Sequence, residues 1–397
     1  MSRKRSVLDA DVAGKRALVR VDFNVPIHDG TVTDDTRIRA ALPTIELLVE
    51  RGARVILMSH LGRPKGEGFE SAFSMAPVAE RLGQLTSAPV TLVGAVTGPL
   101  VQKLADELAP GHILLLENLR FDAREKKNDP AFAAELAELA DIYVDDAFGV
   151  AHRAHASVVG VPALLPAYAG LLLAREVDTI SDMLEEPKRP FVAVLGGSKV
   201  SDKIGVIDHL IDVVDALLIG GGMCFTFMRA QDKAIGTSLV EPDWVERAGE
   251  MLEKARAKGC ELMLPVDYVT ADRFAADADA IVVDADAMPE GRMGLDIGPR
   301  SVAAYAECIA GARTVFWNGP MGVFEMPAFA AGTRGVGEAI AANRDCTSIV
   351  GGGDSVAAVK QFGLEGGVSF VSTGGGASMK LVEGAALPGV EAIPDVR

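Results

Sequence analysis

Short runs of aliphatic and β-branched residues alternate with longer segments of helical periodicity along most of the chain. The runs of the first half are "ALVRV", "RVILM", "ILLL" and "IYVDD". Those of the second half are "FVAVL", "ALLIG", "ELMLP", "AIVVD", "TVFWN", "TSIVG" and "VSFVS". This alternation is typical of βαβ units, so it predicts parallel sheets flanked by helices and an α/β fold class.

Two of the intervening segments predict helices clearly. They are residues 130–140 ("PAFAAELAELA") and residues 242–258 ("PDWVERAGEMLEKARAK"). The second has a proline near its first turn and Gly259 directly after its last residue, which is the asymmetry that helix termini favour.

The chain is longer than one ordinary hydrophobic core supports. Its 397 residues favour two domains of similar size. The segment "LLLAREVDTISDMLEEPKRP" reads as a helix that prolines end just before a new strand. We therefore predict a first domain over residues 1–170, a connecting helix and hinge over 171–189, and a second domain over 190–379.

The residues that follow the predicted strands of the first half are charged or polar. They are Arg20, Asp22 and Asn24 in "VRVDFN", His60 and Arg63 in "MSHLGR", Glu117, Asn118 and Arg120 in "LLLENLRF", and His152, Arg153 and His155 in "DDAFGVAHRAH". Ligands of parallel α/β sheets bind beyond the carboxyl ends of the strands. Taken singly, each arginine near these strands is more typical of a surface ion pair. As a set, they predict a site for a phosphorylated or carboxylated small molecule, and the set is Arg37, Arg39, Arg63, Arg120 and Arg153.

Glycines take the same places in the second half. They form the clusters "VLGGSK", "LIGGGM", "FWNGPMG", "IVGGGDS" and "VSTGGGAS". Glycine lets backbone N–H groups approach an anion, whereas the alternative is a set of tight strand-to-helix turns. One cluster leaves both interpretations open, but five at equivalent points favour a ligand site. The sequence contains neither a G-x-x-x-x-G-K-[ST] loop nor an initial G-x-G-x-x-G. Their absence disfavours a P-loop NTPase and a standard dinucleotide-binding domain.

Three further residues of the second half are candidates for binding phosphate or metal. Lys199 and Lys203 would share one face of a helix around an anion, or form a solvated pair. Asp354 could hold Mg²⁺ that bridges nucleotide phosphates, or cap a helix. The histidines at 60, 152 and 155 have no third metal ligand at diagnostic spacing, so they are predicted to bind anions rather than metal.

Composition narrows the class of protein. Hydrophobic residues make up 49% and charged residues 24%, as in soluble globular proteins, and the net charge of −16 argues against nucleic-acid and membrane-surface partners. The four cysteines form no CxxC pair, so neither zinc nor a disulfide framework is expected and a reducing cytoplasm is the predicted location. The N-terminus lacks a secretory signal, and the apolar residues 158–174 carry two prolines, so we interpret them as a buried connection.

An ordered set of longer motifs closely resembles the phosphoglycerate kinase family from about Arg20 to Pro388. These motifs are "VRVDFNVP", "TRIRAALPTI", "SHLGRP", "LLENLRF", "DAFGVAHRAHAS", "LGGSKVSDKI", "GGGMCFTF", "MGLDIGP", "WNGPMGVFE", "GGGDS" and "VSTGGGASMKLVEG". The resemblance implies two Rossmann-like domains joined by a hinge helix, with residues 380–397 packing back on the first. It also implies a cytoplasmic monomer that binds 3-phosphoglycerate or 1,3-bisphosphoglycerate on the first domain and MgADP or MgATP on the second.

The resemblance assigns roles to individual residues. Phosphoglycerate would be held by Asp22, Phe23, Asn24, Arg37, His60, Leu61, Gly62, Arg63, Arg120 and Arg153. The nucleotide would be held by Lys203, Gly220, Gly221, Gly294, Glu325, Gly352, Gly353, Asp354 and Ser355, with Asp354 on the metal and Glu325 on the ribose. Arg37, Lys199, Gly352 and Gly375 would surround the phosphoryl group in transfer.

The reaction implied is reversible phosphoryl transfer from 1,3-bisphosphoglycerate to ADP, by direct in-line displacement with domain closure. A carboxylate acceptor of pKa about 4 is ionised at neutral pH, so no catalytic base is expected. Two other readings are weaker. A nicotinamide-dependent dehydrogenase lacks its glycine fingerprint here, and a two-lobed periplasmic binding protein would need a signal peptide.

Overall fold

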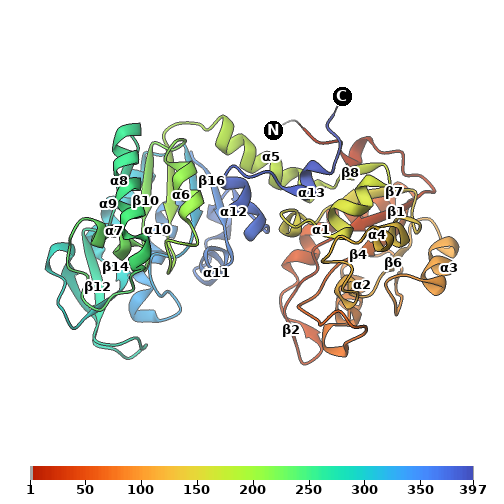
Figure 1. Cartoon of the computed structure of the whole chain (residues 1–397), viewed down its shortest axis with the longest axis horizontal. Helices are drawn as coiled ribbons and strands as arrows, with labels where there is room; N and C mark the ends of the chain where they lie inside the picture. The colour runs from red at the N-terminus through yellow and green to blue at the C-terminus, as the bar shows by residue number, and fades with distance from the viewer. Residues whose placement is uncertain (1–2, 397) are drawn as a thin grey trace. The chain divides into compact units, whose positions relative to one another are not determined.

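The structure is a computed structural model that describes residues 3–396. Packing within the chain divides it into two compact units (Figure 1). The first contains the chain up to Ser181 and again from Ala386, and the second runs from Asp182 to Ala385. Helix α5 (Leu171–Glu185) is the segment along which the chain passes from the first unit to the second.

The first unit is built on a six-stranded parallel sheet. Its order is β5 (Val90–Leu92), β6 (Ile113–Leu115), β4 (Arg54–Met58), β1 (Arg16–Arg20), β7 (Ile142–Asp145) and β8 (Ala167–Ala169). The register places Arg20 beside Met58 on one side and Asp145 on the other. The carboxyl ends of the three central strands therefore lie next to one another, at the place where the sequence puts its polar residues.

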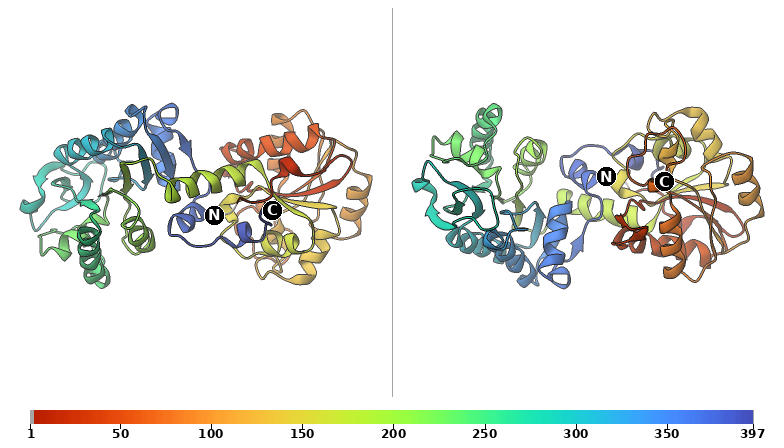
Figure 2. Two further views of the ribbon diagram at one scale, coloured as in Figure 1. Left: turned by 90° about the horizontal axis from the view of Figure 1, so that it is seen from above. Right: turned by 90° about the horizontal axis from the view of Figure 1, so that it is seen from below.

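Helices cover both faces of this sheet (Figure 2). Side chains alternate along β1, so Val19 packs with α1 (Thr36–Glu50) and α2 (Ala76–Leu85), while Leu18 packs with α3 (Pro99–Glu107) and α4 (Pro130–Ala137). A small hairpin of β2 (Ile27–His28) and β3 (Thr31–Val32) follows β1.

The C-terminal segment belongs to the first unit. In α13 (Pro388–Glu391) the Gly389 N–H donates to the Ala151 carbonyl at 2.8 Å. Further on, the Arg5 N–H donates to the Pro394 carbonyl at 2.8 Å, and the Val396 N–H to the Arg3 carbonyl at 2.9 Å. The two ends of the chain are thus hydrogen-bonded to each other.

The second unit repeats the architecture with a second parallel sheet. Its order is β11 (Glu261–Met263), β10 (Ala216–Ile219), β9 (Phe191–Leu195), β15 (Thr314–Asn318), β16 (Thr347–Gly351) and β17 (Phe370–Val371). The helices are α6 (Ile204–Leu210), α7 (Cys224–Ala230), α8 (Val245–Lys258), α9 (Pro299–Ala310), α10 (Ala331–Ala342), α11 (Gly353–Gln361) and α12 (Gly376–Val382). An antiparallel sheet of β13 (Ile281–Asp284), β12 (Asp267–Ala271) and β14 (Met293–Ile297) is attached.

The predicted α/β fold with two parallel, Rossmann-like sheets is confirmed. Every predicted apolar run contains a strand. Strand β13 is the exception to the predicted parallel arrangement, because it lies in the antiparallel sheet and is mostly exposed although its residues are apolar. The predicted helix at 242–258 begins with a 3₁₀ turn at Pro242–Trp244, continues as α8 and ends at Gly259 with φ of 74°.

Strands β5, β8, β12 and β14 were not predicted, and neither were the two short strands of the β2–β3 hairpin. Strands β5 and β8 have only three residues each, which is too short for a periodic pattern to stand out. Strand β8 lies in the apolar segment 158–174, which otherwise forms short helical turns and the beginning of α5. Within residues 3–396, no helix is both long and apolar enough to span a bilayer.

Candidate active site

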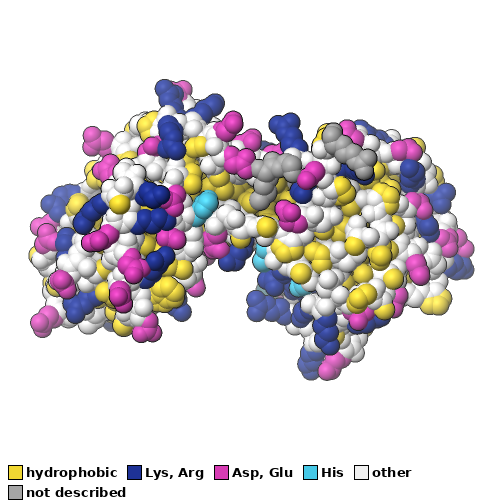
Figure 3. Space-filling model, turned by 45° about the horizontal axis from the view of Figure 1, so that its top comes forward, with side chains coloured by type: hydrophobic (Ala, Val, Ile, Leu, Met, Phe, Trp, Pro, Cys, Tyr) yellow, Lys and Arg dark blue, Asp and Glu magenta, His cyan; other side chains and the backbone are white. Residues whose placement is uncertain are grey.

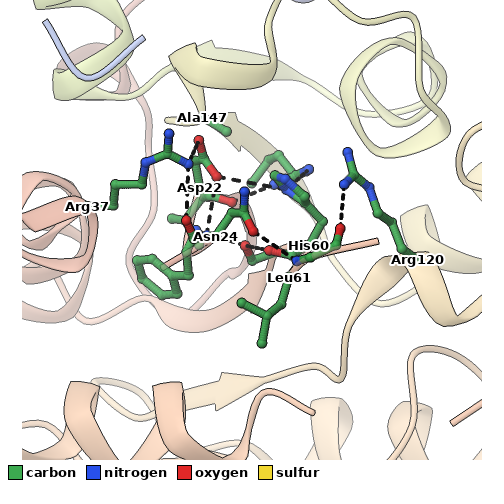
Figure 4. Close-up of polar contacts among 12 residues, drawn as sticks. Asp22, Asn24, Arg37, His60, Leu61, Arg120 and Ala147 are labelled. Atoms are coloured by element: carbon green, nitrogen blue, oxygen red, sulfur yellow. Dashed lines mark hydrogen bonds and ion pairs between the residues drawn. The ribbon is translucent and has the colours of Figure 1, made fainter. Parts of the chain in front are cut away.

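In the first unit, a polar cluster forms where β1 ends and α1 begins. The Asp22 carboxylate accepts a hydrogen bond from Nη1 of Arg37 at 2.9 Å, and the same Nη1 donates to the Asn24 carbonyl at 3.2 Å. The Asn24 side-chain oxygen accepts from the Gly62 N–H at 2.8 Å, which ties this loop to the one that follows β4. Figure 4 shows Asp22, Asn24 and His60 close together, with Arg37 and Arg120 on either side.

The loop after β4 carries His60, Leu61, Gly62 and Arg63. The Gly62 carbonyl accepts from Nη1 of Arg120 at 2.7 Å, so the guanidinium is held against this loop. Arg63 is exposed. Arg153 is exposed as well, but its charge lowers the pKa of Arg120, which places the two guanidinium groups near one another.

Two of the predicted substrate residues have buried side chains. Phe23 is 0% exposed and Leu61 is 4% exposed, and both belong to the core. Their peptide groups are held in place instead: Phe23 N–H donates to the Ser59 hydroxyl at 2.9 Å, and Leu61 N–H donates to the Asn118 amide oxygen at 3.1 Å. These two positions therefore shape the loops rather than offer a side chain to a ligand.

Asn118 is a positioning residue that the prediction did not include. Its side chain bonds the peptide groups of Leu61 and also accepts from the Arg120 N–H at 3.0 Å. It stands in the motif "LLENLRF" among the polar residues that follow the predicted strands, but the sequence assigned it no role, since nothing in the sequence separates a positioning amide from a ligand.

The electrostatics of this cluster indicate an excess of positive charge. Burial, together with the charges of Arg20 and Arg153, lowers the pKa of Arg120 to about 10. Burial and the same group of arginines hold the pKa of His60 well below its usual range, and lower that of His155 to about 4. In the space-filling view, Lys, Arg and His side chains gather at one edge of the unit (Figure 3). A bound anion would relieve this repulsion.

In the second unit, the five glycine clusters follow five neighbouring strands, β10, β9, β15, β16 and β17. Three of these loops touch through backbone alone. A Cβ on Gly319 would lie 2.2 Å from the Gly196 carbonyl oxygen, and a Cβ on Gly221 would lie 2.5 Å from that of Gly197. Both Gly319 and Gly221 also have positive φ angles, of 96° and 67°. The glycines thus form tight turns with close backbone packing, and this packing forms one wall of a pocket.

The pocket has a volume of about 580 Å³. Its lining includes Gly197, Gly221, Gly222, Gly294 and Gly322, the apolar Leu239, Phe274, Met293 and Val323, and the acidic Glu325 and Asp354. Leu239 is 48% exposed and Phe274 62% exposed, and large apolar side chains held open around a pocket are typical of a ligand site. Phe274 comes from the acidic segment "ADRFAADADA", whose sequence offered no signal of a binding site.

Lys199 and Lys203 differ in environment. The segment before α6 is a turn, so the prediction that they share a helix face is wrong. Lys199 is exposed, whereas Lys203 is partly buried and its ammonium contacts the Asn318 amide oxygen. Burial lowers the pKa of Lys203 to about 8, against the opposing effect of Asp354 and Asp202. Asn318 ends β15 and was also not predicted as a site residue.

The other residues predicted at the nucleotide and phosphoryl sites differ in how much space surrounds them. Ser355 is 0% exposed, and its hydroxyl accepts from the Gly319 N–H at 2.6 Å, so its side chain supports the glycine wall. Gly220 is buried against Met321. A Cβ on Gly353 or Gly375 would meet no atom within 4 Å, and a Cβ on Gly352 would lie 2.5 Å from the Asn318 amide nitrogen.

Asp354 fits the part of a metal ligand that shares its ion with a nucleotide. It is exposed in the first turn of α11 and lines the pocket. No group of three or more His, Cys, Asp or Glu side chains within residues 3–396 forms a cage for a metal. Mg²⁺ bound to nucleotides typically uses one or two carboxylates plus phosphate oxygens and water, so a single aspartate suits it.

Two α/β units, one with a cationic cluster and one with a glycine-walled pocket that Asp354 lines and Lys203 adjoins at Gly197, define a phosphotransferase of the small-molecule kinase class. The comparisons with known proteins give the particular family. The sequence model described as phosphoglycerate kinase matches residues 7–385, and the chain belongs to the phosphoglycerate kinase family.

Relatives match over almost the whole chain. The phosphoglycerate kinase of Moorella thermoacetica is 57% identical over 392 residues, and that of Roseiflexus sp. (strain RS-1) is 56% identical over 394, each with 99% of both chains covered. The solved structure of phosphoglycerate kinase from Coxiella burnetii superposes with a TM-score of 0.90 at 44% identity, covering 98% of each chain. The chain is accordingly a glycolytic phosphotransferase that reversibly converts 1,3-bisphosphoglycerate and ADP to 3-phosphoglycerate and ATP, and in the ATP-consuming direction its acceptor is a carboxyl group.

Proposed function

We propose that the cluster at the carboxyl ends of β1 and β4 binds 3-phosphoglycerate and 1,3-bisphosphoglycerate, and that the pocket of the second unit binds ADP and ATP. The observation that carries the proposal is the gathering of Arg37, His60 and Arg120 from three separate segments onto one loop pair, with depressed pKa values for His60 and Arg120. A group of cations that repel one another is stabilised by a ligand that carries a phosphate and a carboxylate.

Within this cluster, guanidinium groups bind the charged ends of the ligand. Arg37 and Arg120 each keep donors beyond their Nη1 bonds, and the exposed Arg63 and Arg153 add charge at the rim. Asn24 and His60 supply neutral hydrogen bonds, and Asp22 orients Arg37. Phe23, Leu61 and Gly62 contribute through the shape of their loops.

In the second unit, the adenine ring lies among Leu239, Phe274 and the glycines 221, 222 and 294, and Glu325 accepts from the ribose hydroxyls. The phosphates lie toward Lys203 and the N–H groups of residues 352–355 at the start of α11, where donors and the helix dipole favour negative charge. Asp354 holds Mg²⁺, which neutralises phosphate charge when bound.

The chemistry needs no general base, because the accepting carboxylate is already ionised at neutral pH. Transfer is direct and in line, and the protein contributes position and charge. We assign Arg37 and Lys199 to the oxygens of the phosphoryl group, together with backbone N–H groups around Gly352 and Gly375. No phosphoenzyme forms.

Three finer expectations belong to the same proposal: the enzyme is a monomer, it works in the cytoplasm, and α5 is part of a hinge that lets the units close. Closure brings the reacting oxygens together and excludes water. Small-angle scattering is expected to show a smaller radius of gyration with 3-phosphoglycerate and a non-hydrolysable MgATP analogue together than with either alone. An unchanged radius would contradict closure, and a radius fitting a dimer would contradict the monomer.

The decisive experiment pairs an assay with two binding measurements. The protein is expected to turn over 3-phosphoglycerate and MgATP in a coupled assay. In calorimetry, Arg120→Met is expected to weaken 3-phosphoglycerate binding about tenfold or more while ADP binding stays unchanged. Glu325→Gln is expected to do the reverse. A loss of ADP binding in Arg120→Met, or unaltered 3-phosphoglycerate binding, would overturn the assignment of the two sites.

A further inference from the structure

Arg20 is a fully buried cation that the roles above leave unused. It is the last residue of β1 and is 0% exposed. A guanidinium group without exposure to water needs partners for its donors, because an unpaired buried charge is strongly unfavourable. All three of its nitrogens have partners, and these partners lead toward the phosphoglycerate cluster on one side and away from it on the other.

On the far side, Arg20 is connected to a buried carboxylate through a serine. Nε of Arg20 donates to the Ser157 hydroxyl at 2.9 Å, and that hydroxyl donates to the Glu125 carboxylate at 2.6 Å. The Glu125 side chain is itself 0% exposed and also accepts from the Ser157 N–H at 3.0 Å. Ser157 lies in a π-helical turn, Ala156–Gly160, so the backbone conformation there fixes the direction of its hydroxyl.

On the near side, Arg20 meets His60. Nη1 donates to the Val21 carbonyl, and Nη2 lies 3.3 Å from Nδ1 of His60. A guanidinium group has donors and no acceptor, so Nδ1 must offer its lone pair to Arg20. The competing partner is the Asp22 carboxylate, whose oxygen is 3.8 Å from the same Nδ1, beyond hydrogen-bond distance.

We propose that Arg20 is a positioning residue that fixes His60 as a neutral imidazole with its proton on Nε2, so that His60 meets the substrate as a hydrogen-bond donor without charge. The inference rests on the proposed function only in placing the substrate beside His60. The tautomer of the His60 ring follows from its contact with Arg20, wherever the substrate binds. Arg20 thereby sets both the tautomer and the charge of a residue that it holds from the buried side.

The surroundings of His60 agree with this state. The charged and titratable groups that face the ring are Arg20 from β1, Asp22 from the loop after it, Arg37 from α1, Arg120 and His155. Burial and the four basic groups all oppose protonation, and Asp22, the one carboxylate of the set, is paired with Arg37 at 2.9 Å. The site therefore takes its positive charge from arginines, which do not titrate near neutral pH.

Long-range ¹H–¹⁵N NMR of the full-length protein with ¹⁵N-labelled histidine tests the inference, since pyridine-type and pyrrole-type nitrogens resonate far apart. The His60 signals are assigned by their loss in His60→Gln. We expect Nδ1 to be pyridine-type and Nε2 pyrrole-type, with no titration between about pH 5 and pH 8. A proton on Nδ1, or a ring that becomes cationic in this range, overturns the inference.

The variant Arg20→Gln is expected to let His60 titrate between about pH 5 and pH 8, because no guanidinium then lies against Nδ1 and the lone pair of Nδ1 can accept a proton. A charged ring then favours the anionic substrate at low pH, so the ratio of the KM for 3-phosphoglycerate in the variant to that in the unaltered enzyme falls about tenfold from pH 8 to pH 5. Taking the ratio cancels the titration of the substrate's own phosphate. Arg16→Gln is the matched control, because Arg16 lies on the same strand and pairs with Asp106 and Asp141 instead.

The two readouts separate the inference from the proposed function. If His60 gains its titration in Arg20→Gln while the KM ratio stays constant, the role of Arg20 is supported and the place of His60 in the substrate site is contradicted. If the variant does not fold, the tautomer in the unaltered protein still decides the inference. A tautomer and pKa that are the same in folded Arg20→Gln as in the unaltered protein would overturn it.

Discussion

The two units carry their proposed anion sites at the same edge of a parallel sheet, and the two sites are built from different materials. In the first unit, side chains position one another: Asp22 holds Arg37, Asn118 holds the loop at Leu61 and the Gly62 carbonyl holds Arg120. In the second, backbone packs on backbone, because Gly196, Gly221 and Gly319 carry no Cβ. Charge deletion should therefore damage the first site, and addition of a methyl group should damage the second.

The largest effect is expected from Arg37→Ala. Loss of a guanidinium that stabilises the transferring phosphoryl group should lower kcat about 10²- to 10³-fold, while the Kd for ADP stays within about twofold. Steady-state kinetics and calorimetry measure the two quantities. Arg39→Ala is the matched control, since Arg39 lies two residues further along α1 and pairs with Asp35 on the surface. Near-normal turnover in Arg37→Ala would remove Arg37 from the mechanism.

Lys199→Ala tests the cation that the second unit contributes. Its exposed ammonium has no fixed geometry before the ligand binds, so we expect a smaller loss of kcat, about 10²-fold, again with ADP affinity preserved. Lys233→Ala, which removes a lysine paired with Asp286 on the same unit, should leave kcat unchanged. A loss of ADP binding equal to the loss of kcat would make Lys199 a nucleotide ligand rather than a catalytic residue.

Gly319→Ala tests whether the second site depends on backbone packing. The new Cβ would approach the Gly196 carbonyl oxygen to 2.2 Å at a φ of 96°, so the second unit should lose about 3 kcal/mol of unfolding free energy. Urea unfolding followed by tryptophan fluorescence measures this, because Trp244 and Trp317 both lie in the second unit.

The matched control for that substitution is Gly291→Ala. A Cβ at Gly291 would meet no atom within 4 Å, and its unfolding free energy should change by less than about 0.5 kcal/mol. Equal urea midpoints for the two variants would mean that the glycines of the wall are interchangeable with alanine, and that the comparison between the two units fails.

The smallest effect concerns pH. Burial lowers the pKa of Lys203 from 10.5 to about 8, so in the free enzyme its charge is present below pH 8 and is lost as the pH rises through that value. The Kd for ADP should therefore increase about tenfold between pH 7 and pH 9. Lys203→Arg, which stays charged, should bind ADP with a flat pH profile. The same slope in both proteins would assign the titration to another group.

The pattern of the sequence was sufficient for the frame and for most of the candidate residues. Parallel strands end at one edge of a sheet, so the residues after each strand gather there, which is how Asn24 and Gly62 come together and how Gly197 and Gly221 do. Prediction was weaker where local periodicity is silent. The turn before α6 was interpreted as helix, and Phe274 reaches the pocket from a segment that looked only acidic.

The sequence by itself determined the two parallel sheets, the polar ends of the first and the glycine ends of the second, because strand direction and side-chain alternation repeat over a few residues. Only the tertiary structure decided which polar side chains remain available to bind a ligand. The Ser355 hydroxyl accepts a hydrogen bond from the Gly319 N–H. Arg20 contacts both His60 and Ser157, and Ser157 lies 137 residues after Arg20 in the chain. Hydrogen-bond partners this distant depend on how helices and loops pack over the sheet, and no local pattern specifies that.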